Sequence, residues 1–150
     1  MPTVTPLPPT VDNLKALTDK FFSLHWNDSC IREKPPAWSN RWIFHNEIPN
    51  GRKQGVYAFV DQKDMVTYIG VGTSRGSKGY EGHGIGSRFY QAYIRVIDEG
   101  KYQPKDKRLE DAGGVMTIGF EPAQAYIANA LELFLIARLN TKHNSNRPGA

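Results

Sequence analysis

Cysteine is nearly absent from this sequence: Cys30 is the only one among 150 residues. A single cysteine cannot form an internal disulfide, and no group of cysteine and histidine residues has the spacing of a zinc site. Neither a disulfide-stabilised scaffold nor a zinc module is therefore expected. A reducing, cytoplasmic setting is the default expectation.

Long apolar runs are also missing. No stretch approaches about 18 apolar residues without a charge, so the sequence predicts no membrane span. The first residues lack a basic segment followed by an apolar one, so no secretory signal is expected. The composition is otherwise ordinary for one globular domain, and a formal net charge of +4 permits an anionic partner without requiring one.

The glycine-rich signatures of nucleotide-binding proteins are absent as well. Residues 72–86 contain six glycines, which invites comparison with a phosphate-binding loop. Neither Gly-x-Gly-x-x-Gly nor Gly-Lys followed by Ser or Thr occurs there, so no nucleotide cofactor is expected. We predict instead a mobile loop that carries polar side chains, namely Arg75, Lys78, Glu81 and His83.

A β-hairpin is the clearest local structure in the sequence. Two runs rich in β-branched and aromatic residues, 56–60 and 65–71, flank a short polar segment. A turn symmetric about residues 62 and 63 would place Tyr57 directly opposite Tyr68, with both phenols on one face. The simplest account of such a pair is a stabilising cross-strand aromatic contact.

The N-terminal third contains a proline-rich arm, a helix and an irregular segment. Residues 1–10 predict an extended arm, and the apolar spacing over 11–24 predicts an amphipathic helix. Residues 25–54 are interrupted by proline and glycine and are expected to be irregular. They hold all three tryptophans of the chain, Trp26, Trp38 and Trp42, which would either anchor this segment on the hairpin or stack on bases.

A helix with a basic side is predicted after the glycine-rich loop. It would begin at Ser87 as N-cap and end near Glu99, before Gly100. Its expected buried stripe comprises Phe89, Tyr93, Val96 and Ile97, and its basic side comprises Arg88, Gln91 and Arg95. That side is either a solvated basic face or a surface for a phosphate backbone, because residues 71–108 contain eight basic and four acidic residues.

The C-terminal third predicts an exposed charged connection, a strand and a buried helix. The connection covers residues 101–113, the strand 114–120, and the helix 123–139, with Pro122 in its first turn. This helix is almost entirely apolar, and Glu132 lies in its middle. A buried carboxylate is costly unless it is paired, so Glu132 either reaches an arginine from another element or binds a divalent metal.

The triplets Gly55-Val56-Tyr57 and Tyr68-Ile69-Gly70, with ten residues between them, resemble the signature of the GIY-YIG nuclease family, with valine in place of the first isoleucine. The order of the elements is also similar: a hairpin, a helix starting near Arg88, a third strand, a helix with Glu132, and Asn144 twelve positions later. The resemblance covers roughly residues 51–146. It implies an α+β fold with a small three-stranded antiparallel sheet flanked by helices, and a division into an N-terminal extension (1–50) packed on a nuclease domain (51–150).

The resemblance also implies the site. Tyr57, Tyr68, Arg88 and Asn144 match catalytic positions, and Glu132 matches the ligand of Mg²⁺ or another divalent cation such as Mn²⁺. In many family members a histidine or tyrosine follows the arginine by one helical turn, but position 92 is alanine here. Tyr93, His83 or Lys78 could take that place as an auxiliary group. The expected DNA contacts are Arg75, Lys78 and Arg95.

The expected activity is metal-assisted hydrolysis of DNA phosphodiester bonds. A restriction-type enzyme that cuts duplex DNA as a homodimer is the first expectation, because the sequence shows no second, DNA-binding domain. A nicking or repair nuclease of a phage or plasmid is compatible with the same residues. The rival from another class is a non-catalytic DNA-binding module that keeps the fold.

Overall fold

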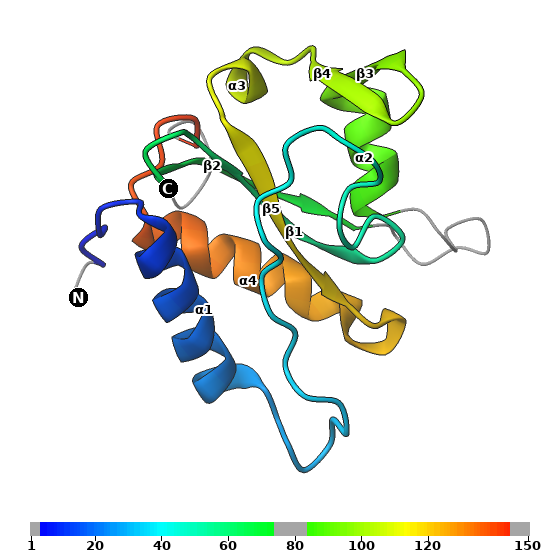
Figure 1. Cartoon of the computed structure of the whole chain (residues 1–150). Helices are drawn as coiled ribbons and strands as arrows, with labels where there is room; N and C mark the ends of the chain where they lie inside the picture. Colours follow the sequence, from blue (N-terminus) through cyan, green and yellow to red (C-terminus); the bar gives the residue numbers. More distant parts are fainter. Residues whose placement is uncertain (1–3, 74–83, 145–150) are drawn as a thin grey trace.

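The computed structural model describes residues 4–73 and 84–144, which form helical layers on both sides of a small sheet (Figure 1). In chain order the elements are α1 (Val11–His25), β1 (Gln54–Val60), β2 (Val66–Gly72), α2 (Ile85–Ala92), β3 (Ile94–Asp98), β4 (Lys101–Pro104), α3 (Lys107–Glu110), β5 (Gly114–Phe120), the 3₁₀ helix η1 (Pro122–Gln124) and α4 (Ala125–Arg138). Among the helices in these two ranges, none has the length and apolarity needed to cross a membrane.

The central sheet has the strand order β2-β1-β5, and both strand pairs are antiparallel. This confirms the predicted α+β class with a small three-stranded antiparallel sheet flanked by helices. β5 has the predicted bounds, and α1 and α4 lie within two residues of theirs. α1 was predictable because its apolar residues recur with the helical period, and α4 because its apolar run is too long for a strand and follows a proline.

The register of the β1–β2 hairpin differs from the symmetric one that the sequence suggested. Tyr57 pairs with Gly70, and Tyr68 pairs with Phe59, so the two tyrosines are diagonal neighbours and do not lie directly opposite each other. They still lie on the same face of the sheet, with ring centroids 6.4 Å apart.

Two one-residue shifts explain this outcome. The turn is one residue longer than expected: the Asp61 N–H donates to the carbonyl of Met65 at 2.9 Å, and Asp64 adopts a left-handed φ of 59°. A bulge at Thr67 in β2, opposite the step from Phe59 to Val60, then shifts the register a second time. Because side chains alternate between faces with a period of two, two shifts restore the original face for both tyrosines.

The sheet separates two hydrophobic cores. One face packs against α1 and α4, which lie side by side in Figure 1. The other face carries the two tyrosines and packs against α2 and the short α3 (Figure 1). We call this second face the phenol face; its buried residues are Trp42, Ile48, Tyr57, Phe59, Tyr68, Ile85, Phe89, Tyr93, Ile94, Leu109 and Val115.

The three tryptophans are packed against the core, as one of the two interpretations expected. Trp26 and Trp42 are buried, and Trp38 Nε1 donates to the hydroxyl of Thr18 on α1 at 2.8 Å. Trp42 and Val115 on β5 exchange two backbone hydrogen bonds, of 2.7 and 3.0 Å. These anchoring contacts therefore run to α1 and β5, and not to the hairpin, where they were predicted.

α2 is shorter than the predicted helix and starts earlier. It begins at Ile85 with Gly84 as N-cap, so Ser87 is not the cap, and it ends at Ala92. The Gly84 position lies close to the chain before β1, where an added Cβ would be 2.2 Å from the carbonyl oxygen of Lys53. The helix start is therefore set by a close tertiary contact that local sequence does not reveal.

The second half of the predicted helix is a strand. Residues 94–98 form β3, which pairs with β4 in an antiparallel ribbon. Val96 and Ile97, which were predicted to be buried, are 67% and 60% exposed. Three of the first four residues of β3 are β-branched, and such side chains lose freedom in a helix and favour strands.

This correction also breaks up the predicted basic face and the predicted connection. Arg88 and Gln91 lie on α2, but Arg95 lies on β3, so the three do not share one helical side. Residues 101–113 are not a plain connection, because they contain β4 and α3.

Candidate active site

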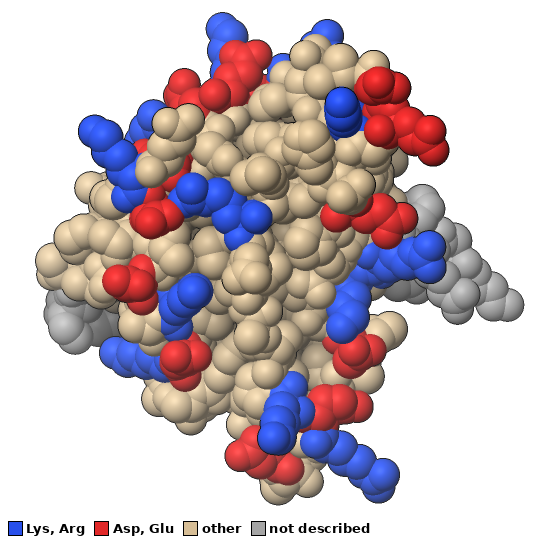
Figure 2. Space-filling view, viewed as in Figure 1, with Lys and Arg blue, Asp and Glu red and all other residues tan. Residues whose placement is uncertain are grey.

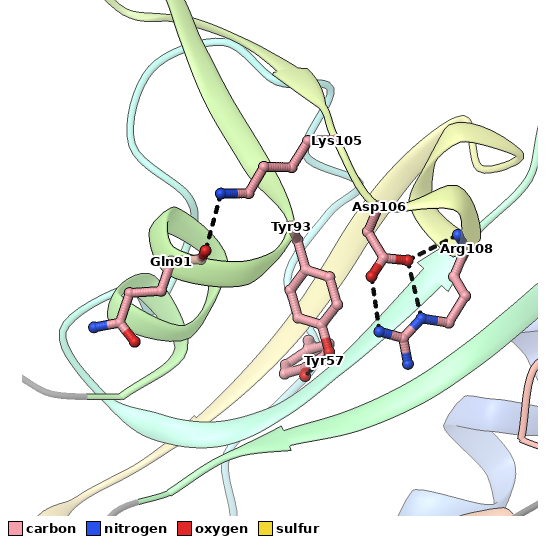
Figure 3. A network of polar contacts seen from close by, with 6 residues as sticks. All are labelled: Tyr57, Gln91, Tyr93, Lys105, Asp106 and Arg108. Carbon is pink, nitrogen blue, oxygen red and sulfur yellow. Dashed lines mark hydrogen bonds and ion pairs between the residues drawn. The ribbon is translucent and has the colours of Figure 1, made fainter.

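Three tyrosines meet on the phenol face of the sheet. Tyr57 comes from β1, Tyr68 from β2, and Tyr93 is the C-cap residue of α2. The hydroxyl oxygens of Tyr57 and Tyr93 are 2.7 Å apart (Figure 3), and Tyr93 also has a side-chain hydrogen bond with Tyr68. All three residues are buried, and we call them the phenol cluster.

The glycine of the second triplet makes room for the tyrosine of the first. Gly70 lies directly opposite Tyr57 in the hairpin, and the Tyr57 ring lies over it. A Cβ at position 70 would be 2.5 Å from two ring atoms and 2.6 Å from the hydroxyl oxygen. The two triplets are therefore linked by packing, in addition to any chemistry that their tyrosines perform.

Burial keeps two phenols of the cluster, those of Tyr57 and Tyr93, protonated at neutral pH. It raises the pKa of the Tyr57 phenol well above its usual range, and the neighbouring Tyr93 adds to this effect; a hydrogen bond from Arg88 opposes it more weakly. Burial also raises the pKa of Tyr93, although its hydrogen bond with Tyr57 and the charge of Arg108 act in the opposite direction. Both phenols are therefore hydrogen-bond donors near pH 7 and not bases.

Arg88 brings a positive charge to the edge of this cluster. It lies on α2, whose buried Phe89 packs edge-on against the Tyr57 ring with centroids 4.8 Å apart. The Arg88 side chain is hydrogen-bonded to Tyr57, and this raises the pKa of the guanidinium. Arg88 itself is exposed, so it connects the buried phenols to solvent.

A second arginine at the cluster was missed in the sequence. The Arg108 guanidinium carbon lies 4.6 Å from the centroid of the Tyr68 ring and 5.4 Å from that of Tyr93. Arg108 is held by Asp106, which is also the N-cap of α3 (Figure 3). An aspartate placed just before the short run Lys-Arg-Leu-Glu is a helix-start signal that could have marked this turn.

Glu132 lies on α4, on the other side of the sheet from the phenol cluster. It is only 5% exposed, as predicted. Asn129, one turn earlier on α4, accepts a hydrogen bond of 3.1 Å from Thr73, just after β2. Residues three apart share a helix face, so Glu132 lies on the side of α4 that borders the end of β2. At this end of β2, the phenol face carries no side chains, because Gly70 and Gly72 occupy it.

Asn144 clamps the free edge of β2. Its Oδ1 accepts from the Ile69 N–H at 2.9 Å and from the Thr141 hydroxyl at 2.6 Å, and its Nδ2 donates to the Ile69 carbonyl at 2.9 Å. The His143 N–H donates to the carbonyl of Thr67. Asn144 thus supports the strand that carries Tyr68, and its carboxamide is buried with partners on both sides.

Four residues named in the sequence prediction remain to be accounted for. Arg75, Lys78 and His83 lie outside the described residues. Arg95 is exposed on β3, which forms the ribbon with β4. On the face of the molecule viewed in Figure 2, basic and acidic side chains are interspersed, so charge alone does not outline a DNA path on this face.

Among the described residues, Glu132 provides a buried carboxylate as a candidate metal ligand. Across residues 4–73 and 84–144, no three His, Cys, Asp or Glu side chains gather as a metal-binding group. A zinc site needs three or four such ligands. Mg²⁺ is commonly held by one or two carboxylates, with water and substrate phosphate completing its shell, so the single buried carboxylate of Glu132 is compatible with it.

Comparisons of this chain with protein-family models, with curated proteins and with solved structures found no match. Its function is therefore argued from its residues and their geometry.

Proposed function

We propose that this protein is a metal-dependent DNA endonuclease of the GIY-YIG type, acting on duplex DNA. The observation that carries the proposal is the meeting of Tyr57, Tyr68 and Arg88 on one face of the sheet. These residues come from three separate elements and match the positions that the sequence resemblance implied. A purely structural aromatic pair would not require the guanidinium of Arg88 beside it.

Arg88 would interact with the scissile phosphate. It is exposed and bonded to a buried phenol, so its guanidinium is oriented before substrate binds. A fixed guanidinium can offset the negative charge that develops when water attacks phosphorus.

Tyr57 would act as a hydrogen-bond donor. A phenol with an ordinary pKa near 10 is already a poor base at neutral pH. Because burial raises the pKa of Tyr57 further, this hydroxyl would orient the attacking water or hold a phosphoryl oxygen, and would not remove a proton.

Glu132 would hold the divalent cation, Mg²⁺ or Mn²⁺. When bound, such an ion would supply polarisation of a phosphoryl oxygen and stabilise the leaving oxyanion. Asn144 would contribute by holding β2, and with it Tyr68, in register.

Cleavage of supercoiled plasmid DNA tests the proposal. Wild type, Glu132→Gln and Tyr57→Phe are compared with and without Mg²⁺. We expect wild type to cut only with the cation and both variants to lose activity. Discrete linear fragments indicate site-specific double-strand cutting, whereas nicked circles alone indicate a nicking or repair enzyme.

Two matched variants control for nonspecific effects. Tyr126→Phe removes a phenol hydroxyl from an exposed site on α4, and Glu99→Gln removes a carboxylate from the exposed tip of the β3–β4 ribbon. Both should cleave like wild type. Full activity in a folded Glu132→Gln variant would contradict the metal role. Retained DNA binding without cleavage on any plasmid would favour the non-catalytic module.

A further inference from the structure

The segment between α2 and β5 delivers one side chain to the phenol cluster. The ribbon of β3 and β4 is tied to α2 at Lys105, whose N–H donates to the Tyr93 carbonyl at 2.8 Å and whose Nζ donates to the Gln91 carbonyl at 2.9 Å (Figure 3). α3 follows directly, and its Leu109 is fully buried in the core of the phenol face. Arg108 lies between Lys105 and Leu109, so the contacts of these two residues restrict its position from both sides.

Asp106 fixes both the backbone and the side chain of Arg108. Its Oδ1 accepts from the Arg108 N–H and from Nε, each at 2.9 Å, and its Oδ2 accepts from Nη2 at 2.8 Å (Figure 3). The pairing lowers the pKa of Asp106 and raises that of Arg108. The ion pair therefore stays charged across the physiological range of pH.

The pair is aimed at the phenol cluster. The Arg108 and Asp106 side chains are 37% and 21% exposed, so an arginine here could extend into water. Instead its guanidinium lies over the rings of Tyr68 and Tyr93 at 4.6 and 5.4 Å, within the range of cation–π contacts. The phenol cluster is thereby flanked by two guanidinium groups, Arg88 at Tyr57 and Arg108 at the other two phenols.

We propose that Arg108, aimed by Asp106, is a positioning residue of this site that holds the rings of Tyr68 and Tyr93 in place for the reaction. The inference rests on the proposed nuclease function for its kinetic consequence, but its structural part is independent of that function. The residue acts through the two phenols and is not assigned a contact with substrate.

Kinetics of DNA cleavage test the consequence. Arg108→Gln should lower kcat by about 10- to 100-fold, because small displacements of positioned groups cost that much, while KM stays within about twofold. Arg108→Lys should recover part of the lost kcat, since lysine retains the positive charge over the rings but cannot form the bidentate hydrogen bonds to Asp106. Combining Arg108→Gln with Asp106→Asn should be no worse than Arg108→Gln alone.

Lys107→Gln is the matched control, because it removes an exposed positive charge from the adjacent position. It should leave kcat unchanged. An Arg108→Gln enzyme with wild-type kcat, or a Lys107→Gln enzyme with the same loss, would overturn the proposal.

NMR of protein labelled with ¹³C at the ζ carbon of tyrosine tests the positioning without any need for activity. Signals of Tyr68 and Tyr93 are assigned with the corresponding phenylalanine variants. Arg108→Gln should shift both signals, and Lys107→Gln neither. Unmoved signals would overturn the proposal even in an active enzyme. If wild type cuts no DNA, the proposed function fails, while the NMR result still decides whether Arg108 positions the phenols.

Discussion

Replacing Asn144 with alanine removes the clamp on the free edge of β2. The side chain makes two hydrogen bonds to the backbone of Ile69 and accepts one from Thr141. Truncation leaves the N–H and the carbonyl of Ile69 without this partner at a buried position. The sequence resemblance matched Asn144 to a catalytic position, whereas this geometry predicts that its main contribution is to stability.

The magnitude follows from these bonds. A neutral hydrogen bond contributes about 0.5–1.5 kcal/mol to the free energy of unfolding, and a buried backbone group left unpaired costs about 1–3 kcal/mol. Water can reach a sheet edge and recover part of that cost. We therefore expect a loss of about 2–4 kcal/mol, which lowers the melting temperature of a chain of this size by roughly 4–16 °C.

Urea unfolding of wild type and Asn144→Ala measures this loss. Asn140→Ala is the matched control, because Asn140 is exposed just after α4, and it should change stability by less than about 0.5 kcal/mol. Asn144→Asp keeps the size but puts a second acceptor against the Ile69 carbonyl, so it should also be destabilised at neutral pH. A stable Asn144→Ala protein that has lost DNA cleavage would refute this reasoning and favour a direct catalytic role.

Three further outcomes follow from the packing and the pKa shifts. Gly70→Ala should lower the free energy of unfolding by about 1–3 kcal/mol, because its Cβ would overlap the Tyr57 ring. Gly113→Ala should cost less in urea unfolding, because its Cβ would come no closer than 3.0 Å, to the flexible Gln62 side chain, and 3.3 Å to the Gln62 backbone nitrogen. Above about pH 10, Tyr57→Phe should lose less stability than wild type. The raised pKa of Tyr57 stabilises the folded protein below the ordinary phenol pKa near 10, and this contribution is lost as pH rises further. Melting temperatures of both proteins from pH 8 to pH 11 test this, and parallel curves would contradict it. Asp106→Asn should approach wild type in stability as pH falls below about 4. The reason is that the lowered pKa of Asp106 stabilises the folded protein only above the ordinary aspartate pKa. Urea unfolding tests this, and a difference in the free energy of unfolding that stays constant down to pH 2 would count against the ion pair.

The local pattern predicted the elements whose own residues decide their structure. β5 could be placed because it is a short run rich in apolar and β-branched residues bounded by glycine and proline, and α4 because its apolar run is too long for a strand. Burial of Glu132 followed from its neighbours on that helix. The hairpin was also predictable, and its two tyrosines share a face because the extra turn residue and the bulge together shift the register by two.

The β3–β4 ribbon was missed because a short stretch of mixed apolar and polar residues fits either a helix or a strand. Residues 94–98 satisfied helical spacing as a continuation of α2, and only pairing with β4 decides for the strand. The error moved Arg95 off the predicted basic face. α3 was missed as well, because a four-residue helix shows too little periodicity in the sequence to be detected.

The sequence by itself determined the α+β class, the order of α1, the β1–β2 hairpin, α2, β5 and α4, and the tyrosines and arginine that mark the candidate site. Only the tertiary structure decided that Tyr93 and Arg108 join the phenol cluster and that Asn144 clamps the edge of β2. The physical reason is distance along the chain: these contacts join residues 36, 40 and 75 positions apart, respectively, and no local propensity encodes such a meeting. They form when the sheet and helices bury their apolar faces together.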